Sequence, residues 1–383
     1  MNSIEPSATS RAAPGEVLLV GSMPFDTVEE VFTQCCSAFG DGLACLPDGE
    51  VGDRRNWTEY LPLRTFGSHP DIEEVRRPQG GRIPLFPDQS VGPGENQDLE
   101  GLLWHFRLRP GTTELVFDDL QYATAGIGSY AVFRRLRAQG AVPEHVRFQV
   151  GFPGSSSAIE EYFCEPDDWP LAKRAYEAAV RTEIARMLEV IPPGDLAIQF
   201  DFSNEVVDLS MGERSAQPWL PKQSIAEKFA RHTASLSELW RGVPEETLLG
   251  YHWCYGTWGG WPRTSMADLG LCVRLSNEAV ARSGRRIDYV HMPVVRHPGE
   301  AFFAPLRDLE IGDTRVFLGL VHHETGRDAL HARLASARSQ LDDFGIAGPC
   351  GYGRVDSAEL PAVLEAHRAG LDALRRRRAE GGS

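Results

Sequence analysis

Three side chains with metal-binding donor atoms follow short apolar segments of this sequence. His252 and Cys254 are two residues apart, so on an extended backbone they point the same way. Cys350 follows a second apolar segment, and His291 ends a third. One imidazole and two thiolates, with a further nitrogen or an open position, form a ligand set that suits zinc. Zinc bound to thiolates can also hold an incoming thiol in its deprotonated, nucleophilic form.

Each of these residues, taken alone, has a simpler interpretation. A cysteine is commonly a buried and inert core residue, and a single histidine is commonly a hydrogen-bonded one. The zinc hypothesis therefore depends on all of them meeting at one end of the fold. The other five cysteines are interpreted as ordinary core residues: Cys35, Cys36, Cys45, Cys164 and Cys272.

Two carboxylates also follow predicted strands. Glu50 ends the stretch 48–50, and Asp201 ends another apolar segment. Such a pair could bind a substrate ammonium group or act as acid and base. The alternative is a structural ion pair with a loop arginine, Arg54 or Arg55.

A glycine-serine pair and several aromatic residues complete the candidate pocket. Gly21 and Ser22 end the first apolar segment, where a glycine permits close approach of the backbone to a ligand, although an ordinary turn is an equal alternative. Four aromatic residues around the metal-binding segment could either wall the pocket or pack the loop: Trp253, Tyr255, Trp258 and Trp261.

Alternating apolar and amphipathic segments predict the fold that would position these residues. The predicted strands span 16–20, 42–46, 146–150, 196–200, 248–252, 287–291, 316–321 and 345–348. The predicted helical segments span 26–38, 129–139, 168–190, 224–240, 265–283, 302–309, 327–344 and 357–375. Repeated alternation implies a parallel sheet, and eight units favour closure into a (β/α)8 TIM barrel. In such barrels the active site lies at the C-terminal ends of the strands, where all these candidates fall.

One segment interrupts this alternation. Residues 55–128, after the second strand, are rich in glycine, proline and aromatic residues and are predicted to be an insertion with its own structure. Within it, 103–108 and 113–117 are predicted to form a hairpin around Pro110-Gly111. Residues 1–15 are expected to be a flexible tail, and 16–383 a single domain.

Composition excludes several classes of protein. The formal net charge is −15, which argues against a nucleic-acid partner. No apolar run approaches the roughly 20 residues of a membrane helix, which argues against a membrane partner. The first residues do not resemble a signal peptide. Seven scattered cysteines do not suggest a disulfide framework, so we expect a cytoplasmic protein.

The ordered series of candidate residues resembles the catalytic C-terminal half of cobalamin-independent methionine synthase. That family belongs to the barrel superfamily that also contains uroporphyrinogen decarboxylase. The resemblance extends from about Val17 to Arg354. In chain order, the matching positions are Gly21-Ser22, Gly49-Glu50, Asp201, His252-Trp253-Cys254 and Cys350-Gly351.

The resemblance implies roles for these residues. His252, Cys254 and Cys350 would bind zinc, and a small-molecule thiol such as homocysteine would bind that zinc and attack an alkyl group. Glu50 and Asp201 would hold the amino group of an amino-acid-like substrate. Ser22 and Gly21 would hold its carboxylate.

Two departures from the family limit this inference. The glutamate that serves the family as a zinc ligand has no clear counterpart here, so His291 is the best substitute and Glu300 the next. The duplicated N-terminal half, which helps the full synthase to bind folate, does not occur in this sequence. The resemblance therefore constrains the thiol chemistry more than it constrains the alkyl donor.

The leading hypothesis is a zinc-dependent S-alkyltransferase, most simply a methyltransferase that uses a small thiol and an alkyl donor. His322 or His323, after the seventh strand, would assist the leaving group, and Asp201 is a further catalytic candidate. Three alternatives remain open. They are a zinc-dependent C–S lyase, a metal-free decarboxylase-type barrel that uses Asp201 and loop arginines, and a small-ligand binding protein.

Overall fold

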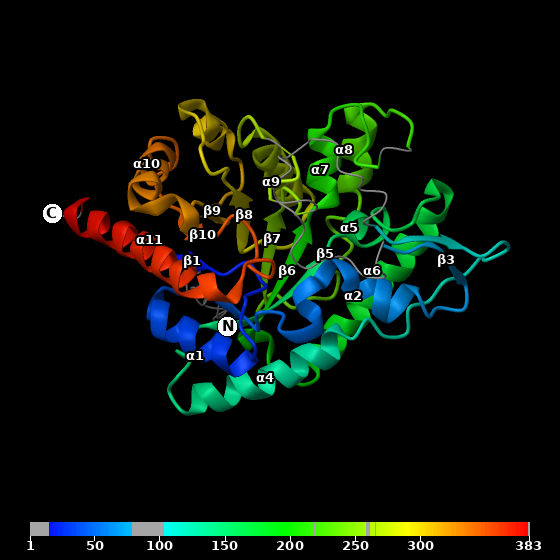
Figure 1. Ribbon diagram of the computed structural model, residues 1–383, viewed down its shortest axis with the longest axis horizontal. Helices are drawn as coiled ribbons and strands as arrows, with labels where there is room; N and C mark the ends of the chain where they lie inside the picture. Colours follow the sequence, from blue (N-terminus) through cyan, green and yellow to red (C-terminus); the bar gives the residue numbers. More distant parts are fainter. Residues whose placement is uncertain (1–14, 79–102, 218–219, 258–260, 265, 382–383) are drawn as a thin grey trace, which may run out of the picture.

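Eight parallel strands form a barrel, as the sequence predicts. The computed structural model describes residues 15–78, 103–217, 220–257, 261–264 and 266–381 (Figure 1). The strands are β1 (Val17–Leu18), β2 (Cys45–Pro47), β5 (Arg147–Pro153), β6 (Leu196–Phe202), β7 (Leu248–Trp253), β8 (Tyr289–Pro293), β9 (Arg315–Gly319) and β10 (Gly345–Ala347). Their order is β1-β10-β9-β8-β7-β6-β5-β2, and a parallel bridge from Val17 to Leu43 closes the ring.

Apolar cores lie on both sides of these strands. Inside the barrel, residues such as Leu18, Ala197 and Phe317 form a small core. A larger core fills the space between the strands and the helices. The strand sequences are nearly continuous runs of apolar residues, because both faces of each strand are buried. Gly250 belongs to the interior, where a Cβ atom would lie 1.9 Å from the Tyr289 ring, so this glycine makes room for the tyrosine.

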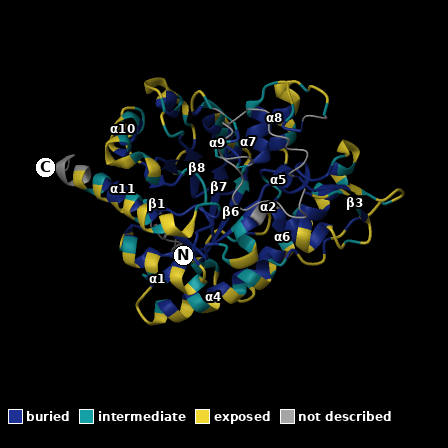
Figure 2. Cartoon of the chain, in the orientation of Figure 1, coloured by how far each residue is buried: buried dark blue, intermediate teal, exposed yellow. Residues whose placement is uncertain are grey.

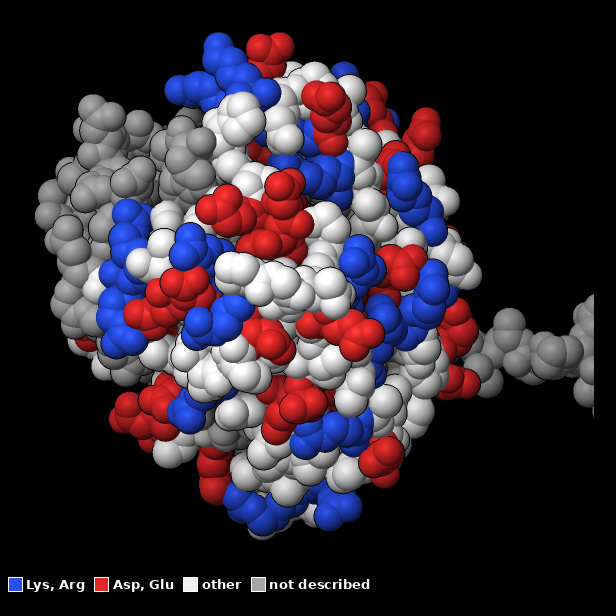
Figure 3. All heavy atoms as spheres, turned by 90° about the vertical axis from the view of Figure 1, so that its right-hand side faces the viewer, with Lys and Arg blue, Asp and Glu red and all other residues white. Residues whose placement is uncertain are grey.

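Helices surround the barrel. The longer ones are α1 (Val28–Phe39), α4 (Tyr122–Ala138), α6 (Trp169–Leu188), α8 (Ile225–Thr233), α9 (Gly270–Arg282), α10 (Gly326–Arg338) and α11 (Leu360–Gly381). Helix α1 packs between α4 and α11, and their exposed residues face outward while buried ones face the strands (Figure 2). A capping box formed by Thr27 and Glu30 fixes the start of α1. On the face shown in Figure 3, acidic and basic side chains are interspersed.

The segment between β2 and α4 differs from its prediction in detail. It contains η2 (Gly52–Asn56), α2 (Trp57–Leu61), η3 (Pro62–Phe66), β3 (Ile72–Arg76) and β4 (His105–Leu108). The predicted hairpin is wrong, because β4 pairs antiparallel with β3 and residues 113–117 form no strand. The reason is aromatic packing: the Phe117 ring lies 5.5 Å from that of Phe66, and the Phe106 ring lies 5.6 Å from it. Helix α4 begins at Tyr122, within the range assigned to the insertion.

Two short helices follow the strands that carry the candidate pocket. They are α5 (Ser155–Ile159) after β5 and α7 (Asn204–Ser210) after β6. A buried polar cluster joins them to α8: His232 Nε2 lies 2.8 Å from Asp208 Oδ2, and His232 Nδ1 lies 3.0 Å from Ser156 Oγ. Lys228 donates to the carbonyl oxygen of Asp208 and to two further carbonyls. This network fixes the loops above β5 and β6 and is sealed from solvent.

The predicted tail of residues 1–15 lies, apart from Gly15, outside the described residues. The described part of the chain contains no helix that is both long and apolar enough to span a membrane. All seven cysteines are free thiols.

Candidate metal centre and substrate pocket

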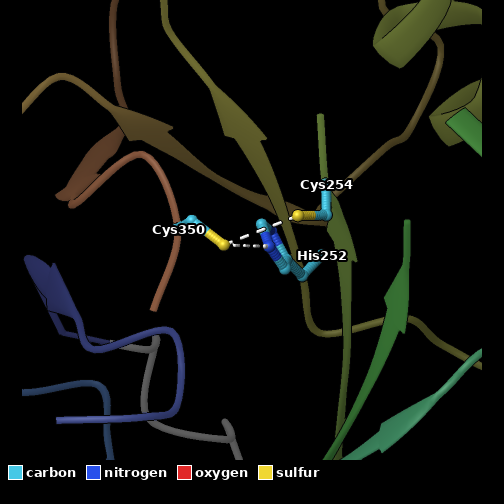
Figure 4. Close-up of side chains that lie close together, drawn as sticks. All are labelled: His252, Cys254 and Cys350. Atoms are coloured by element: carbon cyan, nitrogen blue, oxygen red, sulfur yellow. Dashed lines mark hydrogen bonds between the residues drawn. The ribbon is translucent and has the colours of Figure 1, made fainter. Parts of the chain in front are cut away.

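His252, Cys254 and Cys350 converge at the C-terminal end of the barrel. His252 lies in β7 and Cys254 directly after it, while Cys350 comes from the loop after β10 (Figure 4). Cys254 Sγ lies 3.5 Å from Cys350 Sγ, and Cys350 Sγ lies 3.8 Å from His252 Nε2. Four ligands about 2.3 Å from a tetrahedral zinc lie about 3.8 Å from one another. These two distances, with all three donor atoms within 4.8 Å of one another, are compatible with a single tetrahedral ion.

The electrostatics of the group suit a cation. The hydrogen bond with Cys350, aided by His252, holds the pKa of the Cys254 thiol well below its usual value. The same hydrogen bond and burial raise the pKa of Cys350 well above it. Burial opposes protonation of His252, but the Cys254 thiolate raises the pKa of its imidazole. The two sulfurs thus share one proton, which a metal ion would displace.

His291 lies beside this group but does not belong to it. Its Nε2 donates to the carbonyl of Gly348 at 3.0 Å, and its Nδ1 lies 2.6 Å from His252 Nδ1. Burial lowers the pKa of His291 well below its ordinary value, so the ring is neutral and its Nδ1 is an acceptor. Both ring nitrogens are used, and this contradicts the prediction of His291 as the fourth ligand. Glu300 is exposed at the start of η6 (Glu300–Asp308), away from the group.

The hydrogen bond between the two histidines orients His252, a candidate metal ligand. His252 Nδ1 donates to His291 Nδ1, so in the neutral His252 ring the lone pair is on Nε2, the atom that faces Cys350. An imidazole that binds a metal through one nitrogen commonly donates from the other. Among the described residues, the group has three ligands. An arrangement of three protein ligands and one open position is that of a catalytic zinc site.

The predicted carboxylate pair lies in the same pocket. Glu50 has a left-handed backbone conformation with φ of 51°, and Ser22 Oγ donates to Glu50 Oε2 at 2.5 Å. Gln199 Nε2 donates to Asp201 Oδ1 at 2.7 Å. A non-glycine residue at positive φ is strained, and such strain is concentrated at functional sites. The preceding Gly49 is required, because a Cβ there would lie 2.7 Å from Val31.

The two carboxylates face a slot that is left open by a glycine. A Cβ atom at Gly151 would lie 3.7 Å from Glu50 Oε1 and 3.7 Å from Asp201 Oδ2. Burial raises the pKa of Glu50 to about 7. Burial, with the nearby Glu50 carboxyl, raises the pKa of Asp201 to about 7. A cationic group placed in this slot would stabilise both carboxylates in their charged form.

The alternative ion pairs take other partners. Arg54 Nη2 lies 2.7 Å from Asp48 Oδ2, and Ser129 also donates to this carboxylate. Arg55 donates to the carbonyls of Gly353 and Val355, which ties η2 to the loop after β10. Both arginines therefore hold loops in place around the pocket, and the charge of Arg54 also opposes the rise in the pKa of Glu50 that burial causes.

Two adjoining cavities share a wall at Cys350. The first is lined by the candidate metal ligands and the two carboxylates, together with Gly21 and Ser22. The second has a volume of about 450 Å³ and is lined by Trp261, His322 and His323 among others. Residues that line both cavities are Thr257, Cys350, Gly351 and Arg354.

Two aromatic residues predicted to bind substrate face away from the pocket. Trp253 Nε1 donates to Ser276 Oγ on α9 at 2.8 Å. The Tyr255 hydroxyl lies 3.6 Å from Cys272 Sγ, also on α9. Side chains alternate along a strand, so the register that sends His252 and Cys254 inward sends these two toward the helices. Their assignment to the pocket is wrong, and Trp258 lies outside the described residues.

The two candidate catalytic histidines line the larger cavity. His322 Nε2 donates to the carbonyl of Val294 at 2.7 Å, and burial lowers its pKa to about 3. His322 is therefore neutral at physiological pH, and its N–H is already used. His323 Nε2 lies 3.0 Å from Glu359 and its Nδ1 lies 3.5 Å from Glu324. His323 is the better placed of the two for proton transfer.

Two of the residues that sequence reasoning missed act on the carboxylates. Gln199 orients Asp201, and Gly151 leaves the slot between the carboxylates. The first had a detectable signal, since it lies two residues before Asp201 and shares its face of the strand. Gly151 had no detectable signal in the sequence, because its role depends on the two carboxylates that lie across the barrel from it.

Comparison with known proteins is consistent with the fold. No family model matches the sequence, and a search of curated proteins finds no significant match. Among solved structures, a B12-independent methionine synthase from Shewanella sp. W3-18-1, in complex with selenomethionine, superposes with a TM-score of 0.62 and 14% identity. The match covers 96% of this chain and 100% of that one. A structure from Listeria monocytogenes, described as a vitamin-B12-independent methionine synthase, superposes with a TM-score of 0.51 and 14% identity over 90% of this chain and 86% of that one.

Proposed function

We propose that this chain, which has the barrel fold of the cobalamin-independent methionine synthase structures, is a zinc-dependent S-methyltransferase that acts on a small amino-acid-like thiol. One observation supports the proposal above all: the His252, Cys254 and Cys350 donor atoms all lie within 4.8 Å of one another, in a cavity that also contains Glu50 and Asp201. The first three suit a thiol-binding metal, and the last two suit an ammonium group. An amino-acid thiol carries both groups.

His252, Cys254 and Cys350 would hold the zinc. When bound, zinc supplies Lewis-acid stabilisation of a substrate thiolate at neutral pH. His291 keeps His252 in the required tautomer through the bond between their Nδ1 atoms. The burial of His252 and Cys254 limits the access of bulk water to the ion, and the partly exposed Cys350 lies on the side of the larger cavity.

Glu50 and Asp201 would bind the amino group of the thiol substrate. Both carboxylates border the Gly151 slot, and Gln199 and Ser22 hold them in position. The carboxylate of the substrate would lie by Ser22 and the Gly21 backbone. The Shewanella structure contains selenomethionine, an amino acid with a selenium ether, and this supports the same ligand class here.

The alkyl donor would occupy the larger cavity. The two cavities share a wall at Cys350 and Gly351, so a donor in the larger one would lie beside a thiol bound in the other. Trp261 offers an apolar wall, and His323 with Glu359 offers a proton for the leaving group. His322 is limited to a structural role by its bond to the Val294 carbonyl.

Replacing His291 by alanine is expected to weaken zinc binding by about 10- to 100-fold, the usual effect of losing the partner of a metal-binding histidine. The three ligands stay in place, but His252 loses the acceptor that orients it. A competition titration against a chromophoric chelator measures the affinity. His367→Ala, which removes another fully buried histidine, is the matched control. Unchanged affinity in His291→Ala would show that the contact between the histidines is incidental.

Glu50→Gln is expected to stabilise the protein against unfolding more at pH 8 than at pH 5, relative to the parent. The pKa of Glu50 rises from 4.5 in its ordinary state to about 7 in the folded state, so the folded state prefers the protonated form. In the parent, the contribution of protonated Glu50 to the free energy of unfolding is fully present below about pH 4.5 and is lost as the pH rises through about 7. The loss amounts to at most about 3 kcal/mol. Glutamine cannot ionise, so the Glu50→Gln protein avoids this loss.

Urea unfolding of both proteins at the two pH values measures this difference. The gain of Glu50→Gln over the parent should grow by about 1–3 kcal/mol between pH 5 and pH 8. Glu189→Gln, at an exposed position after α6, should show no such trend. A parallel pH dependence of the Glu50→Gln protein and its parent would mean that Glu50 is not buried as described.

Metal analysis and a paired activity assay test the proposed function. Protein purified without chelators should contain about one zinc per chain, and chelation should lower its melting temperature. Zinc-loaded protein should then be assayed for methyl transfer to homocysteine and for thiol release from thioethers, side by side. Methyl transfer alone supports the proposal. Zinc-free protein that is indifferent to chelation would exclude it, and thiol release alone would replace it by a lyase.

A further inference from the structure

A small cavity lies next to Glu50, on the side away from the metal-binding residues. Its volume is about 20 Å³, and the residues that line it include Glu50, Tyr60, Tyr122 and Gln149. A cavity needs roughly 10–15 Å³ of this kind of space to hold one water molecule. The space therefore fits one water, provided that polar atoms are available to bind it.

The first such atom is the amide oxygen of Gln149. The Nε2 atom of this buried side chain donates to the Val20 carbonyl at 2.9 Å and to the Leu19 carbonyl at 3.3 Å. Carbonyls only accept, so the orientation of the amide is settled and Oε1 faces the other way. Gln149 Oε1 is buried and has no hydrogen-bond partner.

The second atom is the hydroxyl of Tyr122, the first residue of α4. Its ring is held between those of Phe152, at 4.8 Å, and Tyr60, at 5.3 Å. The Tyr122 hydroxyl is also buried without a partner. Burial raises its pKa well above the usual value, so it remains a hydrogen-bond donor at every relevant pH.

Gln149 Oε1 and the Tyr122 hydroxyl are two buried polar atoms of one cavity. Each lacks a partner, both residues line the same cavity, and they do not bond to each other. A buried polar group without a hydrogen-bond partner is unfavourable, so two of them around one water-sized space point to a shared bridging molecule. Glu50 lines the same cavity, and its Oε2 accepts a hydrogen bond from Ser22.

We propose that Tyr122 and Gln149 hold an internal water molecule against the Glu50 carboxylate. The Tyr122 hydroxyl donates to the water oxygen, and the two water hydrogens are donated to Gln149 Oε1 and to Glu50. Glu50 is then held from two sides, by Ser22 on one and by the water on the other. Tyr122 and Gln149 are positioning residues, and their effect on the proposed function passes through Glu50.

A crystal structure of the ligand-free protein at about 2 Å or better tests the water directly. The expected result is an ordered water within hydrogen-bond distance of Tyr122 Oη, Gln149 Oε1 and a Glu50 oxygen. Tyr122→Phe should lose that water or show it weakly, with the ring in place. An empty cavity in the parent protein, or a direct bond between Tyr122 and Gln149, would overturn the proposal. This result does not depend on whether the protein transfers methyl groups.

Ligand binding tests the positioning role, which rests on the proposed function. Calorimetry on zinc-loaded protein should compare homocysteine with 4-mercaptobutanoate, which lacks the amino group. Tyr122→Phe should weaken homocysteine binding about 3- to 10-fold and leave 4-mercaptobutanoate unchanged. Tyr130→Phe, the same change on the same helix at a hydroxyl that bonds to Asp195, should affect neither. An equal loss for both thiols in Tyr122→Phe would count against the role, and failure of the parent to bind either thiol would instead count against the proposed function.

Discussion

Replacement of Cys350 by serine should remove zinc from the protein and abolish thiol alkylation. A serine hydroxyl is a much poorer zinc ligand than a thiolate, and only His252 and Cys254 would remain of the three-residue group. Loss of a residue that merely supports a ligand costs about 10- to 100-fold in metal affinity, so loss of a ligand should cost more than about 100-fold. Zinc content after dialysis, and the rate of methyl transfer, measure the effect.

Cys272→Ser is the matched control for this change. Cys272 is also a buried thiol, it lies on α9, and burial raises its pKa to about 12. This variant should keep its zinc. Melting temperatures of both variants in the presence of a chelator separate metal loss from misfolding, because without metal the Cys350→Ser protein should melt close to its parent. A Cys350→Ser protein that retains zinc and activity would exclude the metal centre described above.

Asp201→Asn should weaken binding of an amino-acid thiol by about 150- to 5,000-fold. The substitution keeps the shape of the side chain but removes one of two charges that face the Gly151 slot. Removing one partner of a buried charge pair costs about 3–5 kcal/mol. Because the pKa values of Asp201 and Glu50 are both about 7, the parent should bind the ammonium more weakly at pH 6 than at pH 8, and the asparagine variant should keep only the part of this dependence that comes from Glu50. Calorimetry with homocysteine at both pH values measures it.

A thiol without an amino group tells the role of Asp201 apart from a general structural effect. Binding of 4-mercaptobutanoate should change little in Asp201→Asn. Asp195→Asn, just before the other end of the same strand, should leave both thiols unaffected. Should Asp201→Asn instead reduce binding of the two thiols equally, Asp201 would be a structural residue and the ammonium would have to bind elsewhere.

The barrel itself was predictable because its signal is local. Each strand of β5 to β10 is a short apolar run followed by a turn and an amphipathic helix, and eight such units leave few alternatives to a closed ring. The pairing of β3 with β4 was not predictable in the same way. Residues 113–117 have the composition of a strand, but Phe117 packs on Phe66, and β4 finds its partner some thirty residues earlier in the chain.

For the site, the sequence alone determined which residues meet at the C-terminal end of the barrel. Strand alternation places His252 and Cys254 on one face, and strand order brings Cys350, Glu50 and Asp201 to the same end. The same alternation, applied strictly, would also have sent Trp253 outward. These inferences succeed because side-chain direction repeats every two residues and is independent of the rest of the chain.

Only the tertiary structure decided what each of these residues does. The ring nitrogens of His291 are used by the Gly348 carbonyl and by His252, so a residue with the chemistry of a ligand orients one instead. Gly151 is important because two carboxylates lie across the barrel from it. Tyr122 and Gln149 are important because each has a buried polar atom without a hydrogen-bond partner, and both residues line one cavity. The physical reason is the same in each case. A hydrogen-bond partner or an open space depends on the register between strands and on loops distant in the chain, which local patterns do not encode.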